Sequence, residues 1–126
     1  YILMSASTEH HPNPQMDQGS GCEFCRIVAS QVPAKVVYQD NDVIVIHNRL
    51  QWVPVMLLVM PKKHMSQEEM WQSPIIARLA EVAVQMGKEH CPEGFRILSN
   101  FGHQAMQSQP HGHLHVVGGA QMGRYV

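Results

Sequence analysis

The chain has 126 residues, of which 44% are hydrophobic, so it is long enough to bury the core of a single domain. Its 9 basic and 10 acidic residues give a formal net charge of −1, which argues against duplex nucleic acid as a partner. The longest apolar run, residues 53–61, is far shorter than the roughly 18 residues that a membrane-spanning helix needs, so no membrane partner is expected.

The first 20 residues are mostly polar and contain two adjacent histidines and two prolines within residues 10–14. They hold no apolar stretch long enough for a secretory signal. We therefore expect residues 1–20 to form a flexible tail and residues 21–126 to form one domain.

From residue 21 onward the pattern predicts one short helix and then three strands. The helix is expected over residues 23–30, because Pro33 closes it. Strands are expected where apolar and β-branched residues run between turn residues or prolines: 35–38, 43–47 and 55–60. A turn at residues 40–42 separates the first two strands.

Helix start signals dominate the next part of the chain. Ser66 and Glu69 have the spacing of a capping box, which predicts the start of a short helix. Ser73 and Pro74 then supply an N-cap and a first-turn proline for a longer helix that runs to about Glu89. One face of this helix is marked by apolar residues spaced by four, three and four positions: Ile75, Leu79, Val82 and Met86.

Two more strands are expected at residues 95–100 and 113–117, joined by a loop over residues 102–110. Strands and helices are thus mixed without a regular alternation of the two. This order predicts an α+β fold with an antiparallel sheet of about five strands, one long helix and one or two short helices.

Three histidines alternate with other residues near the last strand: His111, His113 and His115. Because side chains of an extended strand alternate between two faces, all three are expected on one face, with neighbours about 6.6 to 7 Å apart. Each imidazole offers a donor or an acceptor near neutral pH, so the patch suits a phosphate group or a metal ion. A purification tag would be contiguous and terminal, which these histidines are not.

Residues 100–122, which hold these histidines, resemble the signature of the histidine triad (HIT) family of nucleotidyl hydrolases and transferases. The ending at residues 118–122 resembles that of the nucleotide phosphoramidase branch of the family. Three earlier segments resemble family landmarks in the family's order: 22–28, 32–38 and 61–64. The resemblance implies a HIT-like fold and a homodimer.

The resemblance implies a reaction at the middle histidine, His113, which would attack the α-phosphorus of a nucleotide and form a nucleotidyl-histidine that water resolves. His115 would contact the phosphate or the leaving group, and Ser108 would bind phosphate oxygens or stabilise developing charge. The implied substrates are nucleoside 5′-monophosphate esters or amides, such as a purine nucleotide or a nucleoside phosphoramidate. The further nucleotide contacts implied are Phe24, Ile27, Ile46, Asn48, Asn100, Gly102 and Gln107.

Two positions depart from the family pattern. Asn48 stands where the phosphoramidases usually place an aspartate on the ribose, and its amide lacks the charge that strengthens such a bond. Met56 stands where the family tends to carry a histidine, so the preference for purines is left open. The apolar residues at positions 24, 27 and 46 are expected to form a wall for the base, although core packing is the default for such residues.

Cys22 and Cys25 form a Cys-x-x-Cys pair, which by itself is compatible with a redox pair, a metal site or two buried thiols. Some HIT proteins bind zinc through such a pair and two histidines, which here are His64 and His111. A Cys₂His₂ set suits a closed, tetrahedral structural zinc site. Reduced thiols in a cytoplasm, the expected location, favour a metal over a disulfide. Cys91 is expected to be structural.

Two other functions are compatible with these residues. The first is a nucleotide-binding or zinc-stabilised interaction module with negligible turnover, which a test with an adenylate amide would distinguish from a hydrolase. The second is a histidine-rich metal-binding protein, which would bind several metal ions at the histidines rather than about one zinc per chain.

Overall fold

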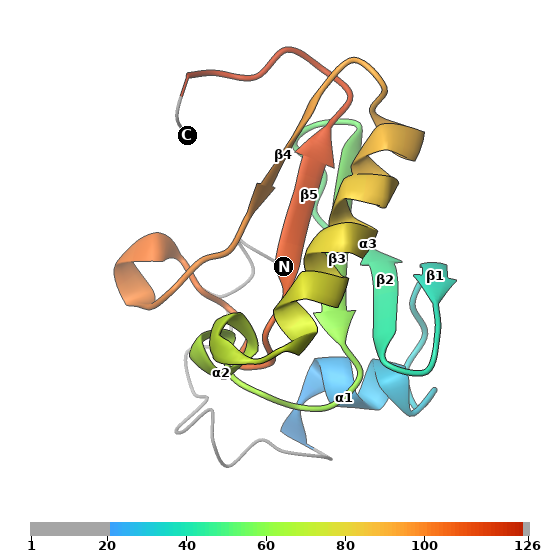
Figure 1. Cartoon of the computed structure of the whole chain (residues 1–126), viewed down its shortest axis with the longest axis vertical. Coiled ribbons are helices and arrows are strands. Elements are labelled where there is room, and N and C mark those ends of the chain that lie inside the picture. The colour runs from blue at the N-terminus through green and yellow to red at the C-terminus, as the bar shows by residue number, and fades with distance from the viewer. Residues whose placement is uncertain (1–20, 125–126) are drawn as a thin grey trace.

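The computed structural model describes residues 21–124; the flexible tail expected at residues 1–20 lies outside the described residues. The described elements follow in chain order (Figure 1): α1 (Glu23–Val28), β1 (Val36–Gln39), β2 (Val43–His47), β3 (Val55–Pro61), α2 (Gln67–Gln72), α3 (Ile75–His90), β4 (Phe95–Leu98), the 3₁₀ turn η4 (His103–Ala105) and β5 (Leu114–Gly118). Each helix and strand expected from the sequence is present, so the predicted α+β fold is confirmed.

The five strands form one antiparallel sheet in the order β1-β2-β3-β5-β4. The last strand, β5, is inserted between β3 and β4, because α2 and α3 carry the chain from β3 to the sheet edge before β4 forms. His115 therefore lies on an inner strand of the sheet, opposite Leu58 of β3 and Leu98 of β4.

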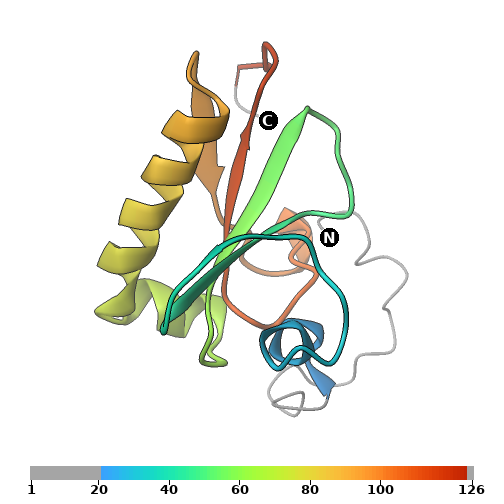
Figure 2. The same ribbon diagram turned by 90° about the vertical axis from the view of Figure 1, so that its right-hand side faces the viewer.

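The two faces of the sheet bury different side chains because successive residues of a strand point to opposite sides. Figure 2 shows α3 on one side of the sheet and α1 on the other. On the α3 side the buried cluster comprises Val43, Val45, Leu57, Val59, Met70, Leu79, Val82, Ala83, Met86, Leu114 and Val116. On the α1 side it comprises Cys22, Phe24, Ile27, Ile44, Ile46, Leu58 and Met60. His115 alternates with two residues of the first cluster and so faces the α1 side.

The helices begin where the sequence indicates. Ser66 and Glu69 exchange the two hydrogen bonds of a capping box at the start of α2. Helix α3 begins at Ile75, yet Pro74 already has helical dihedral angles and the Ser73 hydroxyl accepts a hydrogen bond from the N–H of Ile75 (3.3 Å), so the expected cap is present. No helix within residues 21–124 is long and apolar enough to cross a membrane.

The segment before β5 differs from the expectation. β5 begins at Leu114, so of the three histidines only His115 lies within the strand. The N–H of Gly112 donates to the carbonyl of Met65 (2.7 Å) rather than to a neighbouring strand, which delays the start of the sheet pairing. The short turn η4 lies within the expected loop over residues 102–110, where three exposed residues leave no apolar period in the sequence that would predict it.

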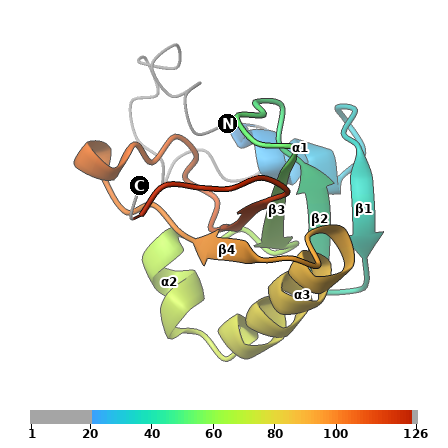
Figure 3. The same ribbon diagram turned by 90° about the horizontal axis from the view of Figure 1, so that it is seen from above.

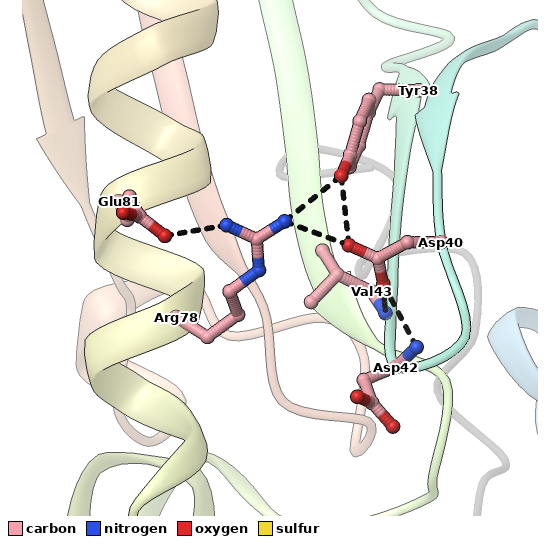
Figure 4. A network of polar contacts seen from close by, with 6 residues as sticks. All are labelled: Tyr38, Asp40, Asp42, Val43, Arg78 and Glu81. Carbon is pink, nitrogen blue, oxygen red and sulfur yellow. Dashed lines mark hydrogen bonds and ion pairs between the residues drawn. The ribbon is translucent and has the colours of Figure 1, made fainter.

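A polar network joins the β1–β2 hairpin to α3 (Figure 4). Asp40 accepts a hydrogen bond from the backbone N–H of Asp42 (2.8 Å) and one from the hydroxyl of Tyr38 (2.8 Å). Arg78 of α3 donates to both Tyr38 (2.9 Å) and Asp40 (3.0 Å), and also pairs with Glu81. The Asp42 N–H, together with the other donors, holds the pKa of the Asp40 carboxyl well below its usual range. The charged carboxylate thus fixes the turn that the sequence predicts.

Candidate active site and metal centre

Four potential metal ligands meet although they are up to 89 positions apart in the chain. Cys22 is the N-cap of α1, and its sulfur accepts a hydrogen bond from the N–H of Cys25 (3.4 Å), so one helical turn places both thiols together. His64 follows β3 and His111 precedes β5. The ligand atoms of all four residues lie within 4.8 Å of one another.

The spacing of these atoms fits a tetrahedral zinc ion. The Sγ atom of Cys25 lies 3.2 Å from Nδ1 of His64 and 3.5 Å from Nδ1 of His111, and Sγ of Cys22 lies 3.6 Å from the same His111 atom. A zinc ion with Zn–S bonds of about 2.3 Å and Zn–N bonds of about 2.0 Å would separate sulfur and nitrogen by about 3.5 Å. The cluster therefore has the donor set and spacing of a structural zinc site, as predicted.

The surroundings of the cluster also favour a metal. Nε2 of His111 donates to the carbonyl of Pro61 (2.7 Å), so the ring proton lies there and Nδ1 is left as a ligand atom. Burial lowers the pKa of His111 to about 4, which keeps its ring neutral. Burial raises the pKa of the Cys22 thiol to about 12, and a bound zinc ion would supply the positive charge that deprotonates it.

His113 lies between the metal cluster and β5. Its Nδ1 donates to the carbonyl of His111 (2.8 Å), so Nε2 carries no proton in the neutral ring. The Phe24 ring packs edge-on against it, with centroids 5.3 Å apart. Burial lowers the pKa of His113 to about 4, so the ring is neutral at pH 7. A neutral imidazole with one unprotonated nitrogen is the form that can act as a nucleophile.

His115 lies beside His113, with ring centroids 4.9 Å apart. Its side chain is only 1% exposed, and neither ring nitrogen has a hydrogen-bond partner among the described residues. Burial lowers the pKa of His115 to about 3, so this ring is also neutral at pH 7. Buried polar groups are nearly always paired, so the unpaired nitrogens of His115 are an exception that a functional role of this ring would explain.

The backbone of His113 is held by two side chains, and no sequence motif indicates either of them. The Oε1 atom of Gln67 accepts a hydrogen bond from the N–H of His113 (2.9 Å), and the hydroxyl of Ser99 donates to its carbonyl (2.8 Å). Gln67 also donates from Nε2 to the carbonyl of Asn100 (3.1 Å). A glutamine at the first position of a short helix is normally exposed, so the sequence carries no signal for this contact.

Local hydrogen bonds shape the loop that the resemblance assigns to phosphate binding. Gln107 accepts a bond from the N–H of Gly102 (2.9 Å) through Oε1 and donates through Nε2 to the carbonyl of Gln109 (3.1 Å). Gly102 has φ of 84°, a left-handed conformation that glycine adopts without strain. Ser108 follows in the chain and is half-buried. Contact of these residues with a phosphate stays a prediction.

The residues expected to bind the base and ribose lie in two places. Phe24, Ile27 and Ile46 are buried in the cluster on the α1 side, which matches the core alternative raised by the sequence. A pocket of about 350 Å³ beside β2 is lined in part by Ile46 and Asn48, while none of the three triad histidines lines it. Asn48 is held there because its Oδ1 accepts a hydrogen bond from the N–H of Leu50 (3.2 Å). Their roles in nucleotide binding stay predictions.

Comparison with known proteins agrees with this geometry. The model of the HIT domain family matches residues 29–122. Adenylylsulfatase HINT1 of Arabidopsis thaliana is 35% identical over 105 residues, which cover 79% of this chain and 71% of that protein.

Two solved structures are similar in both sequence and fold. A HIT family hydrolase from Clostridium thermocellum has a TM-score of 0.78 at 28% identity, covering 85% of this chain and 97% of its own. A Zn-bound histidine triad family protein from Mycobacterium smegmatis has a TM-score of 0.68 at 31% identity, covering 77% of this chain and 73% of its own. The chain belongs to the HIT family, in which it resembles the HINT branch.

Proposed function

We propose that this protein is a HIT-family hydrolase that cleaves nucleoside 5′-monophosphate esters or amides, with His113 as the nucleophile. The observation that supports this best is that the ring of His113, whose Nε2 is unprotonated, packs beside the buried ring of His115. The nitrogens of His115 make no hydrogen bond within the described part of the chain. The name of the Arabidopsis relative, an adenylylsulfatase, indicates an adenylyl group in the substrate of that protein. A purine nucleotide or a nucleoside phosphoramidate is the substrate that we propose here.

In the proposed reaction the Nε2 lone pair of His113 attacks the α-phosphorus, and the bond from phosphorus to the amine or alcohol breaks. The leaving group keeps the bonding electron pair and takes a proton from water. Water then attacks the nucleotidyl-histidine, the Nε2–phosphorus bond breaks with its electron pair returning to Nε2, and the nucleoside monophosphate leaves. The proton that this water loses neutralises the hydroxide left when the leaving group was protonated, so one water is added overall. We propose that His115, Ser108 and Gln107 contact the phosphate oxygens as charge develops on them.

We propose a structural role for zinc, because a site with four protein ligands has no open position for a substrate. The zinc-bound relative from M. smegmatis supports a zinc ion in this chain. The metal would join α1 to His111, whose carbonyl accepts the hydrogen bond from His113. Within residues 21–124 this is the one group of potential metal ligands, and it includes only one of the three alternating histidines. This argues against the alternative of a histidine-rich protein that binds several metal ions at those histidines.

We propose that the protein is a homodimer formed through the outer edge of β4. β4 is the last strand of the sheet, and its Ile97 is 37% exposed. An edge strand with an exposed apolar side chain is a template for pairing with a second copy. The cytoplasm is the compartment that we propose, because Cys22, Cys25 and Cys91 are all free thiols.

The first prediction concerns the nucleophile. His113→Ala should abolish turnover of an adenosine 5′-phosphoramidate and leave much of the affinity for AMP, because the phosphate keeps its other contacts. Intact mass spectrometry of wild-type protein quenched during turnover should detect a nucleotidylated chain, which the variant lacks. His103→Ala, an exposed histidine in η4, is the control and should retain activity. Substantial activity in His113→Ala would show that another group attacks, and no turnover by wild-type protein would favour the interaction-module alternative.

The second prediction concerns the metal. Metal analysis of protein grown with ample zinc should find about one zinc per chain. Cys22→Ser combined with Cys25→Ser should remove the zinc and lower the melting temperature, because a metal held by distant segments stabilises the fold. Cys91→Ser is the control, since Cys91 lies outside the cluster, and it should keep the zinc. Zinc-free wild-type protein would contradict the assignment.

The third prediction concerns the ribose. If Asn48 faces the sugar, Asn48→Asp should raise the ratio of kcat/KM for ribonucleotide over deoxyribonucleotide substrates, because a charged acceptor binds a hydroxyl more strongly than an amide does. The gain should be about 1 kcal/mol, or roughly five-fold. Asn41→Asp in the exposed β1–β2 turn is the matched control. An unchanged ratio in Asn48→Asp would mean that this position does not contact the ribose.

The fourth prediction concerns assembly. Wild-type protein should sediment as a dimer, and Ile97→Lys should shift it toward the monomer, because a charge on an edge strand opposes pairing. Val84→Lys, on an exposed position of α3, tests whether the helix surface also contributes. Monomeric wild-type protein at micromolar concentration would refute the dimer.

A further inference from the structure

The main chain at the proposed nucleophile is held by side chains rather than by the sheet. β5 begins one residue after His113, and the N–H of His113 donates to the buried amide of Gln67 (2.9 Å). On the other side, the hydroxyl of Ser99 donates to the carbonyl of His113 (2.8 Å). A rotation of this peptide would move the imidazole, so the groups that bind it help to set where Nε2 points.

The side chain of Gln67 makes a second hydrogen bond besides the one to the N–H of His113. Its Nε2 donates to the carbonyl of Asn100 (3.1 Å), which lies just before the loop assigned to phosphate binding. One side chain, only 2% exposed, therefore ties the nucleophile to the start of that loop. Both of its hydrogen bonds are to backbone groups, and without Gln67 the buried N–H of His113 would be left unpaired.

Gln67 lies in the first turn of α2, which is held by hydrogen bonds and by close packing. The capping box between Ser66 and Glu69 holds the first turn of the helix. Gly112 packs directly on this turn: a Cβ atom at that position would lie 3.0 Å from the carbonyl oxygen of Ser66 and 3.0 Å from Cβ of Met70. The glycine between the two histidines therefore lets the chain approach α2 closely enough for the N–H of His113 to reach Gln67.

We propose that Gln67 is a positioning residue for the nucleotidyl transfer: its buried amide fixes the backbone of His113 relative to Asn100 and thereby aims Nε2 of His113 at the α-phosphorus. This inference rests on the proposed function, because it assumes that His113 is the nucleophile. It does not place Gln67 in contact with the substrate. A displacement of the reacting atom by about 1 Å can lower a rate roughly 100-fold, so a residue that acts only through the backbone can have a large kinetic effect.

The test compares the rate of nucleotidyl transfer with nucleotide affinity. Gln67→Met keeps the size of the side chain but loses both hydrogen bonds. In single-turnover reactions with adenosine 5′-phosphoramidate, its rate constant for nucleotidylation should fall about 10- to 100-fold. The Kd for AMP should change by less than about three-fold, because Gln67 does not touch the nucleotide. Gln72→Met, at the exposed C-terminal end of the same helix, should react at the wild-type rate.

A conservative variant separates positioning from simple stability. Gln67→Glu keeps an oxygen that accepts from the N–H of His113, so its rate should lie between those of Gln67→Met and the wild type, with zinc content unchanged in both variants. If Gln67→Met does not fold, Gln67→Asn replaces it, because its shorter side chain cannot span both backbone groups, and the same difference between rate and Kd is expected.

Each outcome bears on one claim. A wild-type rate in Gln67→Met, or an unchanged rate with ten-fold weaker AMP binding, would overturn the positioning role while the proposed function stands. Absence of nucleotidylation in the wild-type chain itself would instead remove the proposed function on which the inference depends.

Discussion

The path of residues 111–115 is the constraint on which the rest of the structure depends. In this short segment His111 turns toward the two cysteines, while His113 and His115 form a pair of rings on the α1 side of the sheet. The carbonyl of His111 accepts the Nδ1 proton of His113 (2.8 Å), so the residue that completes the metal cluster also sets the tautomer of the proposed nucleophile. A displacement of His111 would therefore alter both the metal cluster and the hydrogen bond that its carbonyl accepts from His113.

The remaining elements hold this segment in place. Seen from above, β3 and β2 lie between α1 and α3 (Figure 3). The sheet thus separates α3 from the α1 side, which carries His115 and the metal cluster. Helix α1 brings Cys22, Cys25 and Phe24 to the cluster, and the ring of Phe24 packs against both His111 and His113. Helix α2 contributes Gln67 and the close contact with Gly112. The metal centre, the proposed nucleophile and the loop at Asn100 are thus parts of one packed unit.

The features that could be predicted from the sequence are those with short-range signals. The Cys-x-x-Cys pair and the alternating histidines are visible because chemistry requires fixed residue types at fixed spacing. The capping box at Ser66 and the cap at Ser73 are equally local. The α+β class followed from the order of the elements. By contrast, the insertion of β5 between β3 and β4 depends on pairing between segments far apart in the chain, which no local pattern specifies.

The roles of Gln67 and Ser99 could not be predicted, because they come from side chains that reach backbone groups across the fold. The start of β5 at Leu114 depends on the same contacts, since the N–H groups of Gly112 and His113 bind Met65 and Gln67 instead of a strand. The sequence leaves two interpretations open for Phe24 and Ile46, namely a wall for the base or core packing. Both residues are buried in the α1-side cluster, on the same side of the sheet as His115.

The central claim is that the fold holds His113 as a neutral ring with its proton on Nδ1 and with Nε2 unprotonated. Long-range ¹H–¹⁵N correlation spectra of the zinc-loaded protein, labelled at histidine, measure this directly at pH 7. The account predicts an unprotonated Nε2 and a protonated Nδ1 for His113, assigned by comparison with His113→Ala. A ring that carries its proton on Nε2, or on both nitrogens, would contradict it.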